Sequence, residues 1–173
     1  MIKVCFVSRI AFFKRFLAVV SFSILAGILF FSIPSSKVHL DKLPIDFKHD
    51  RLVLVTFWSI DCSVCLAELP VIKKIWLNWH NKNLNVIGVS MWYDDPKLLS
   101  NFVERNKTVL PYPVLWDGDK KIQQGFGKVL ATPLSFLVDV PNRQIKKTYL
   151  GKIDFAQVDE DVGHILINKD LSY

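Results

Sequence analysis

Two cysteines, Cys62 and Cys65, stand two residues apart directly after the apolar run Leu52–Trp58. In such a C-x-x-C pair, one thiolate can attack a disulfide of another protein and the second thiol can then resolve the mixed disulfide. The two thiolates could instead hold a metal ion. They could also form an inert staple, although a disulfide across two residues closes a very short loop and restricts the unfolded chain little. The spacing alone leaves these three kinds of chemistry open.

The rest of the chain narrows the metal alternatives. The chain has only three cysteines, so it has no second cysteine pair for a structural zinc site. The third cysteine, Cys5, is also separated from the pair by a long apolar segment. Leu66 follows the second cysteine where a haem-attachment motif would have His. Cu(I) held by the two thiolates, with His80 or His164 as a third ligand, is an alternative that spacing does not exclude. Spacing, position and compartment together favour redox chemistry, for which we expect no metal.

The predicted elements around the pair indicate how it could react. Leu52–Trp58 is continuously apolar, which is typical of a strand buried on both faces. From residue 66 to 79 apolar residues recur every three or four positions, which predicts an amphipathic helix with Pro70 inside it. The backbone N–H groups at this helix N-terminus would stabilise an anion at Cys62. We therefore predict that Cys62 attacks and that Cys65, one turn further in, resolves.

The remaining pattern predicts one α/β domain with the element order β-α-β-α-β-α-β-β-α. The further strands are expected at 84–91, 112–116, 134–140 and 144–150, and the further helices at 96–107, 119–126 and from residue 155 onward. Asp94 or Asp95 is expected to cap the second helix, with Leu98 and Leu99 among its inward residues, and Asp154 to cap the last.

The N-terminal part of the chain predicts a membrane anchor. Residues 16–36 contain no charge and approach the roughly 20 apolar residues that a spanning helix needs. The segment exceeds a usual signal-peptide core and lacks a small-residue cleavage site, so we expect it to stay uncleaved. Residues 1–15 carry four basic residues and no acid, which predicts a cytoplasmic tail. We expect a lead-in at 37–50 and a domain at 51–173 outside the cytoplasm, facing the periplasm or an equivalent space.

The same charges explain the net charge of +6, because four of the basic residues belong to the tail. No basic stripe follows elsewhere, so we expect no nucleic acid partner. A second part of the site is expected at Thr132-Pro133, directly before the predicted strand 134–140. A proline there cannot donate to a strand ladder, and it restricts the residue before it to an extended backbone.

Four stretches, in chain order within residues 52–166, carry a resemblance to a known family: FWSIDCSVCLAELP, VIGVSMWYDDPKLLSNFVERN, YPVLWDGDKKIQQGFG and TPLSFLVD. Together they resemble the TlpA/ResA-like membrane-anchored thiol–disulfide oxidoreductases of the thioredoxin superfamily. The resemblance implies a thioredoxin-like fold, with a central mixed β-sheet flanked by helices, behind one transmembrane helix. It implies a redox-active Cys62–Cys65 disulfide as the only redox group, and a cis Thr132–Pro133 step that lies against the dithiol and pairs with the partner's chain.

The resemblance also concerns three further positions, of which two match the family's pattern and one departs from it. Glu68 matches an acidic residue that could raise thiol pKa values or relay a proton, and Trp58 matches an aromatic residue beneath the active site. With Thr132 and Pro133, Trp58 and Asp61 are expected to form the substrate-binding surface. Asp61 stands where the family often has Trp, and its charge should raise the pKa of the Cys62 thiol. A less stable thiolate favours the oxidised form, which makes the reduced protein a better reductant.

The expected function is reduction of protein disulfides outside the cytoplasm. That space holds no free thiol pool, so a transmembrane thiol carrier is the expected electron donor. The resemblance suggests apocytochromes c among the substrates. Two alternatives stay open at this point: a Cu(I)-binding protein that uses the same cysteines, and a disulfide oxidant or isomerase of the same fold.

Overall fold

The computed structural model describes residues 37–170, while residues 1–36 and 171–173 lie outside the described part. The predicted tail and the predicted anchor at 16–36 therefore lie outside it, and both stay predictions. Within the described range, every helix is too short or too polar to span a bilayer.

The centre of the domain is a five-stranded mixed sheet with the strand order β3-β2-β1-β4-β5. Its strands are β1 (Leu52–Trp58), β2 (Leu84–Ser90), β3 (Val114–Trp116), β4 (Leu134–Asp139) and β5 (Gln144–Leu150). The first three strands pair in parallel, and β4 and β5 join antiparallel to β1 and to each other. A mixed sheet was predicted, and the predicted order of elements is confirmed.

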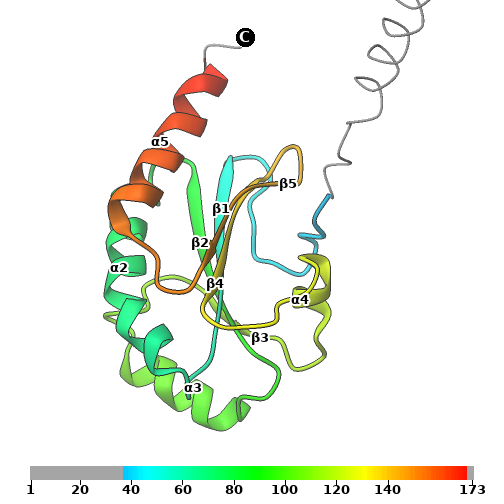
Figure 1. The fold of residues 1–173 in the computed structure, drawn as a ribbon, viewed down its shortest axis with the longest axis vertical. Coiled ribbons are helices and arrows are strands. Elements are labelled where there is room, and N and C mark those ends of the chain that lie inside the picture. Colours follow the sequence, from blue (N-terminus) through cyan, green and yellow to red (C-terminus); the bar gives the residue numbers. More distant parts are fainter. Residues whose placement is uncertain (1–36, 171–173) are drawn as a thin grey trace, which may run out of the picture. The chain divides into compact units, whose positions relative to one another are not determined.

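Helices cover both faces of the sheet, which explains the unbroken apolar run of β1. The helices are α2 (Ser63–Trp79), α3 (Pro96–Arg105), α4 (Lys121–Gly125) and α5 (Phe155–Asp170). Alternate residues of β1 enter two separate cores, with Leu54 packed on the side of α2 and α5, and Val55 on the side of α4. Figure 1 shows α2 and α5 on one side of the sheet and α4 on the other. Each residue of β1 is thus buried whichever way its side chain points.

Residues 37–50, the expected lead-in, pack into the second core. Val38, Leu40 and Leu43 are buried, and the Val38 N–H donates to the Arg143 carbonyl at 2.9 Å. The backbone also passes close to α4: a Cβ placed on Gly125 would lie 2.9 Å from a carbonyl oxygen of this segment. The domain core therefore begins at the start of the described range rather than at β1.

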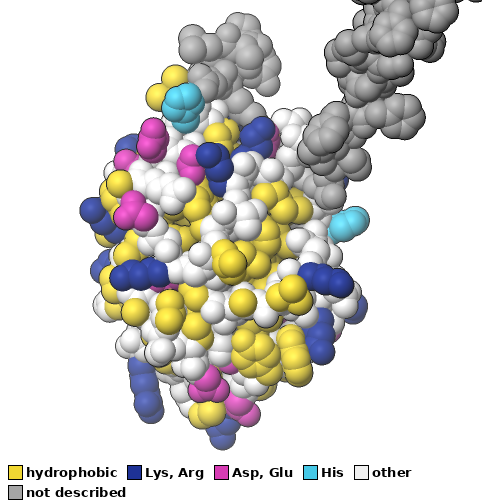
Figure 2. Space-filling view, in the orientation of Figure 1, with side chains coloured by type: hydrophobic (Ala, Val, Ile, Leu, Met, Phe, Trp, Pro, Cys, Tyr) yellow, Lys and Arg dark blue, Asp and Glu magenta, His cyan; other side chains and the backbone are white. Residues whose placement is uncertain are grey.

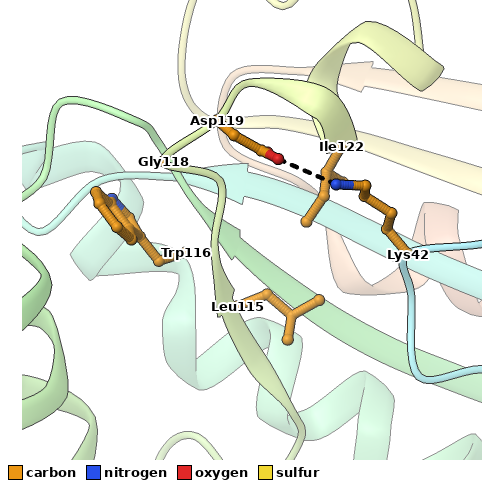
Figure 3. Close-up of a pocket in the computed structure, with 6 residues that line it drawn as sticks. All are labelled: Lys42, Leu115, Trp116, Gly118, Asp119 and Ile122. Carbon is orange, nitrogen blue, oxygen red and sulfur yellow. Dashed lines mark hydrogen bonds and ion pairs between the residues drawn. The ribbon is translucent and has the colours of Figure 1, made fainter.

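A surface hollow of about 420 Å³ lies between the lead-in and the β3–α4 connection. Lys42 and Asp119 pair across it at 3.0 Å (Figure 3). Hydrogen bonds from Lys121 and Lys42 hold the pKa of Asp119 well below its usual range. The Trp116 ring lies over Gly118, where a Cβ would approach the ring to 2.5 Å. None of the predicted site residues lines this hollow.

The end of the sheet where β1 and β2 stop exposes large apolar side chains. Val64, Trp92 and Tyr93 are each between 42% and 51% exposed. Figure 2 shows apolar side chains spread over the lower half of the face in view, the part of the molecule in which α2 begins in Figure 1. This apolar end surrounds the turn from β1 into α2.

Several predicted boundaries differ from the structure by a few residues. Strand β3 starts only at Val114, because Pro113 has no N–H to donate to a ladder. Helix α4 starts at Lys121, where the Asp117 carboxylate accepts the N–H groups of the next two residues at 2.8 and 2.9 Å. The inward placement of Leu98 was wrong, because its side chain is 58% exposed while Leu99 is buried.

Candidate active site

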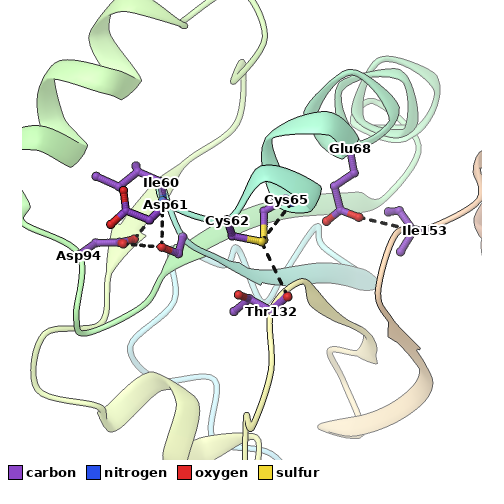
Figure 4. Close-up of a disulfide and its surroundings, with 9 residues drawn as sticks. Ile60, Asp61, Cys62, Cys65, Glu68, Asp94, Thr132 and Ile153 are labelled. Carbon is purple, nitrogen blue, oxygen red and sulfur yellow. Dashed lines mark hydrogen bonds between the residues drawn. A yellow bond between two sulfur atoms is a disulfide. The ribbon is translucent and has the colours of Figure 1, made fainter.

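Cys62 and Cys65 form a disulfide at the junction of β1 and α2, with an S–S distance of 2.07 Å (Figure 4). Cys62 is the N-cap residue of α2, and its Sγ accepts the Cys65 N–H at 3.2 Å. The same N–H can stabilise a thiolate on Cys62 after reduction. Cys62 is partly exposed, whereas Cys65 is fully buried. A partner can therefore reach the first sulfur and not the second, which is the asymmetry that the predicted roles require.

The Thr132–Pro133 segment lies directly against the disulfide. Its peptide bond is cis, and the Thr132 carbonyl oxygen lies 3.7 Å from Cys62 Sγ. The two segments meet because β4 runs antiparallel beside β1, with Leu134 opposite Phe57. The Pro133 carbonyl accepts the N–H of Gly151, which ties this step to the end of β5. In the reduced protein, the Cys62 thiol is placed to donate to the Thr132 carbonyl.

Glu68 lies one helical turn after Cys65, on the buried side of α2. Its side chain is 0% exposed, and its Oε2 accepts the Ile153 N–H at 3.2 Å, while Oε1 has no partner among the described residues. Burial raises the pKa of Glu68 to about 7, against smaller lowering effects of the Ile153 N–H and the Lys152 charge. A carboxyl group with such a pKa can accept and return a proton near neutral pH.

The four residues expected to form the substrate-binding surface do not share one environment. Trp58 is 1% exposed and packs against Phe102 with ring centroids 5.8 Å apart, in the same core cluster as Cys65. Pro133 is also buried, whereas Asp61 is exposed and Thr132 partly exposed. Trp58 is buried beneath the active-site turn, which agrees with the aromatic residue that the resemblance implies there. Its part in substrate binding, like that of the other three residues, stays a prediction.

One polar residue beside the site was missed. Asp94 was considered only as a helix cap, but Asp95 caps α3 and Asp94 is buried against the turn between β1 and α2. Ser59 and Ser90 contact the same carboxylate. These residues are up to 35 positions apart in the chain, so no local spacing links them. Only the parallel pairing of β1 with β2 brings them together.

Of the two histidines considered as a third ligand for Cu(I), His80 or His164, His80 lies far from the cysteines along α2. His80 is the C-cap residue of α2, at the opposite end from Cys62. Eighteen residues at 1.5 Å per residue separate the two ends by about 27 Å. Within residues 37–170, no three His, Cys, Asp or Glu side chains gather in a way that could hold a metal ion.

Comparison with known proteins supports a thioredoxin-like protein. The chain is 28% identical over 102 residues to the thiol-disulfide oxidoreductase ResA of Bacillus thuringiensis, covering 59% of this chain and 56% of ResA. The chain thus spans about half the length of the curated relatives it matches.

Solved structures give the same fold. A candidate thioredoxin from Neisseria meningitidis has a TM-score of 0.63 and 30% identity, covering 72% of this chain and 81% of that one. The thioredoxin domain of a Bacteroides vulgatus thiol-disulfide oxidoreductase has a TM-score of 0.54 and 29% identity, covering 68% and 81%. The sequence profile of the AhpC/TSA family matches residues 34–148, which is more than half of the chain. The protein therefore belongs to the AhpC/TSA family, on a thioredoxin-like fold.

Proposed function

We propose that this protein is a thiol–disulfide oxidoreductase that acts through Cys62 and Cys65. One observation carries the proposal: the two cysteines form a disulfide at a helix N-terminus, with one sulfur accessible, the other buried, and the Thr132 carbonyl beside the accessible one. The similarity to ResA supports the same activity.

The reaction transfers two electrons and two protons. In the reduced protein, the Cys62 thiolate attacks one sulfur of a substrate disulfide and expels the other substrate sulfur as a thiolate, which takes up a proton. Cys65 then gives its proton to Glu68 and attacks Cys62 Sγ. The Cys62–Cys65 disulfide forms, the second substrate sulfur leaves, and Glu68 can return the proton to it. The substrate disulfide is reduced to two thiols, and the protein dithiol is oxidised.

Electron flow is proposed to run from the protein to its substrate. The carboxylate of Asp61, the residue directly before Cys62, disfavours the Cys62 thiolate, and a disfavoured thiolate makes the reduced form a stronger reductant. The uncharged segment 16–36 and the basic tail before it support a single-pass anchor with the domain outside the cytoplasm. The proposed donor is a transmembrane thiol carrier. The proposed substrates are disulfide-bonded proteins of that space, with apocytochromes c as one class.

A trapping experiment tests the reaction and identifies the partner. The Cys65→Ser variant should accumulate a mixed disulfide on Cys62, because the resolving thiol is missing. The Cys62→Ser variant is the matched control and should trap nothing, because Cys65 is buried. Equal trapping by both variants would contradict the assigned roles.

Two measurements on the wild-type protein test the activity and its direction. A reduction potential near about −270 mV would support a reductant, and one near about −120 mV would make the protein an oxidant. Stoichiometric tight Cu(I) binding without reduction of insulin would contradict the oxidoreductase and favour the copper-binding alternative.

A further inference from the structure

Asp94 is a buried carboxylate that the proposed reaction does not yet use. It lies between β2 and α3 and is 3% exposed. Its Oδ2 accepts the Ile60 N–H at 3.3 Å (Figure 4). Its Oδ1 accepts the Ser59 hydroxyl at 2.6 Å, and Oδ2 also accepts the hydroxyl of Ser90. Two of these three donors, Ser59 and Ile60, belong to the turn that leads from β1 to Cys62.

The fold holds Asp94 in place from both sides. The Met91 N–H donates to the Trp58 carbonyl at 3.0 Å, and the Asp94 N–H donates to the Met91 carbonyl at 3.1 Å. On the other side, the Asp95 carboxylate accepts the Lys97 and Leu98 N–H groups at 2.9 Å and starts α3. The backbone that carries Asp94 is therefore held by hydrogen bonds outside the turn that its side chain contacts.

Hydrogen bonds within the turn connect Asp94 to Cys62 through Ser59. The Ser59 Oγ donates to Asp94 and accepts the Asp61 N–H at 3.1 Å, while the Ser59 carbonyl accepts the Cys62 N–H at 3.2 Å. Ser59 thus fixes the turn at two points, and Asp94 fixes Ser59. Figure 4 shows Asp94 on one side of the turn and the disulfide on the other.

The chemistry of the contact also gives Asp94 an electrostatic effect. Its three described partners are all uncharged donors, so none of them carries a positive charge that would offset a negative charge on its oxygens. Water screens a buried charge less than an exposed one. A negative charge behind the turn therefore opposes a second negative charge on the Cys62 sulfur.

We propose that Asp94 is the positioning residue for Cys62: it fixes the turn that carries the attacking sulfur, and its charge opposes a thiolate there. The proposal rests on the proposed function, since it names the group that keeps the dithiol reducing. It transfers the main electrostatic role from Asp61, which is exposed, to Asp94, whose buried charge water screens less.

The other polar groups around Cys62 differ from Asp94 in charge or in exposure, so its effect on the Cys62 thiolate can be measured separately. Asp61 on the same turn faces solvent, and the Thr132 carbonyl is a neutral acceptor. Glu68 on α2 is partly protonated at neutral pH, since burial raises its pKa to about 7. Glu68 is therefore mostly protonated at pH 6, the pH at which the test below is read.

The electrostatic half is tested by Asp94→Asn in the reduced full-length protein, with Asp95→Asn as the matched control. Asn keeps the shape and an acceptor oxygen but removes the charge. The rate of Cys62 alkylation by iodoacetamide is followed against pH, with mass spectrometry of the Cys62 peptide as readout. Asp94→Asn should raise the rate at pH 6 by about threefold or more, the change that half a pKa unit produces. Asp95→Asn should leave the rate unchanged.

The positioning half is tested by Ser59→Ala, which cuts the link to the turn and keeps the Asp94 charge. The readout is hydrogen exchange of the Cys62 amide, whose acceptor is the Ser59 backbone carbonyl and not the deleted hydroxyl. We expect exchange at least about tenfold faster, as for an amide whose turn opens locally.

Equal alkylation profiles for wild type, Asp94→Asn and Asp95→Asn would overturn the proposal, as would unchanged exchange in Ser59→Ala. If Asp94→Asn does not fold, the exchange result decides alone. Neither readout needs a substrate disulfide. A wild-type protein that fails to reduce insulin would therefore overturn the proposed function and leave the Asp94 result standing.

Discussion

Replacement of Glu68 by Gln should change how the stability of the protein depends on pH. The Glu68 side chain is 0% exposed, and burial raises its pKa from 4.5 to about 7. At about 1.4 kcal/mol for each pKa unit, ionising Glu68 costs roughly 3 kcal/mol more in the folded protein than in the unfolded chain. Gln keeps an oxygen for the Ile153 N–H and has no charge to bury.

The direction of this pH dependence follows from the pH at which Glu68 loses its proton in the unfolded chain and in the folded protein. The unfolded chain ionises Glu68 near 4.5, whereas the folded protein keeps the proton until about 7. The contribution of Glu68 to stability is therefore complete below 4.5, falls as the pH rises, and is lost above about 7. The buried Tyr112 nearby does not titrate in this window, because burial raises the pKa of its hydroxyl above the usual value.

Urea unfolding of the oxidised protein at pH 5 and pH 8 measures this difference. Wild type should lose roughly 2 to 3 kcal/mol more than Glu68→Gln between the two pH values. Glu104→Gln is the control and should behave like wild type, because Glu104 is exposed and pairs with Lys107 on the surface. Identical pH dependence in wild type and Glu68→Gln would refute the argument that Glu68 is buried as an acid with a raised pKa.

Three further predictions concern stability, and the first two of them test the packing of the lead-in segment. Leu40→Ala should lower the free energy of unfolding by about 2 to 5 kcal/mol, because Leu40 is fully buried in the second core, while Leu130→Ala, at a site 86% exposed, should change it little. Gly125→Ala should destabilise by about 1 to 3 kcal/mol, since its Cβ would lie 2.9 Å from the lead-in backbone. Gly163→Ala, in a helix with no contact closer than 3.7 Å, should stabilise by about 1 kcal/mol. Thermal unfolding of the four variants measures all of these, and a stable Leu40→Ala or Gly125→Ala would show that the lead-in does not pack as described.

Local sequence patterns predicted most elements of the fold. The apolar run of β1 predicted a strand buried on both faces, and the two core clusters explain it. The change from that run to a helical period placed the cysteines at the start of α2, where Cys62 lies as N-cap. These predictions succeed because strand and helix periods, caps and turn residues act over a few neighbouring positions.

The lead-in shows where local patterns fail. Its Pro, Ser and charged residues predicted a connecting segment, yet Leu40 is among the largest fully buried side chains. Isolated apolar residues in a polar segment carry no period, so their burial depends on the surface against which they lie. Here that surface is formed by α4 and by strands that come later in the chain.

The reacting cysteines could be identified from local sequence, because they stand at a strand-to-helix junction. An acid three residues after the second cysteine and a Thr-Pro step before a later strand were visible in the same way. The groups that surround the two cysteines depend on the tertiary structure. The pairing of β1 with β4 sets the Thr132 carbonyl 3.7 Å from Cys62, and the pairing of β1 with β2 sets Asp94 behind the turn. The physical reason is that strand neighbours arise from long-range sheet registry, which brings together residues 35 and 70 positions apart without any mark in their local sequence.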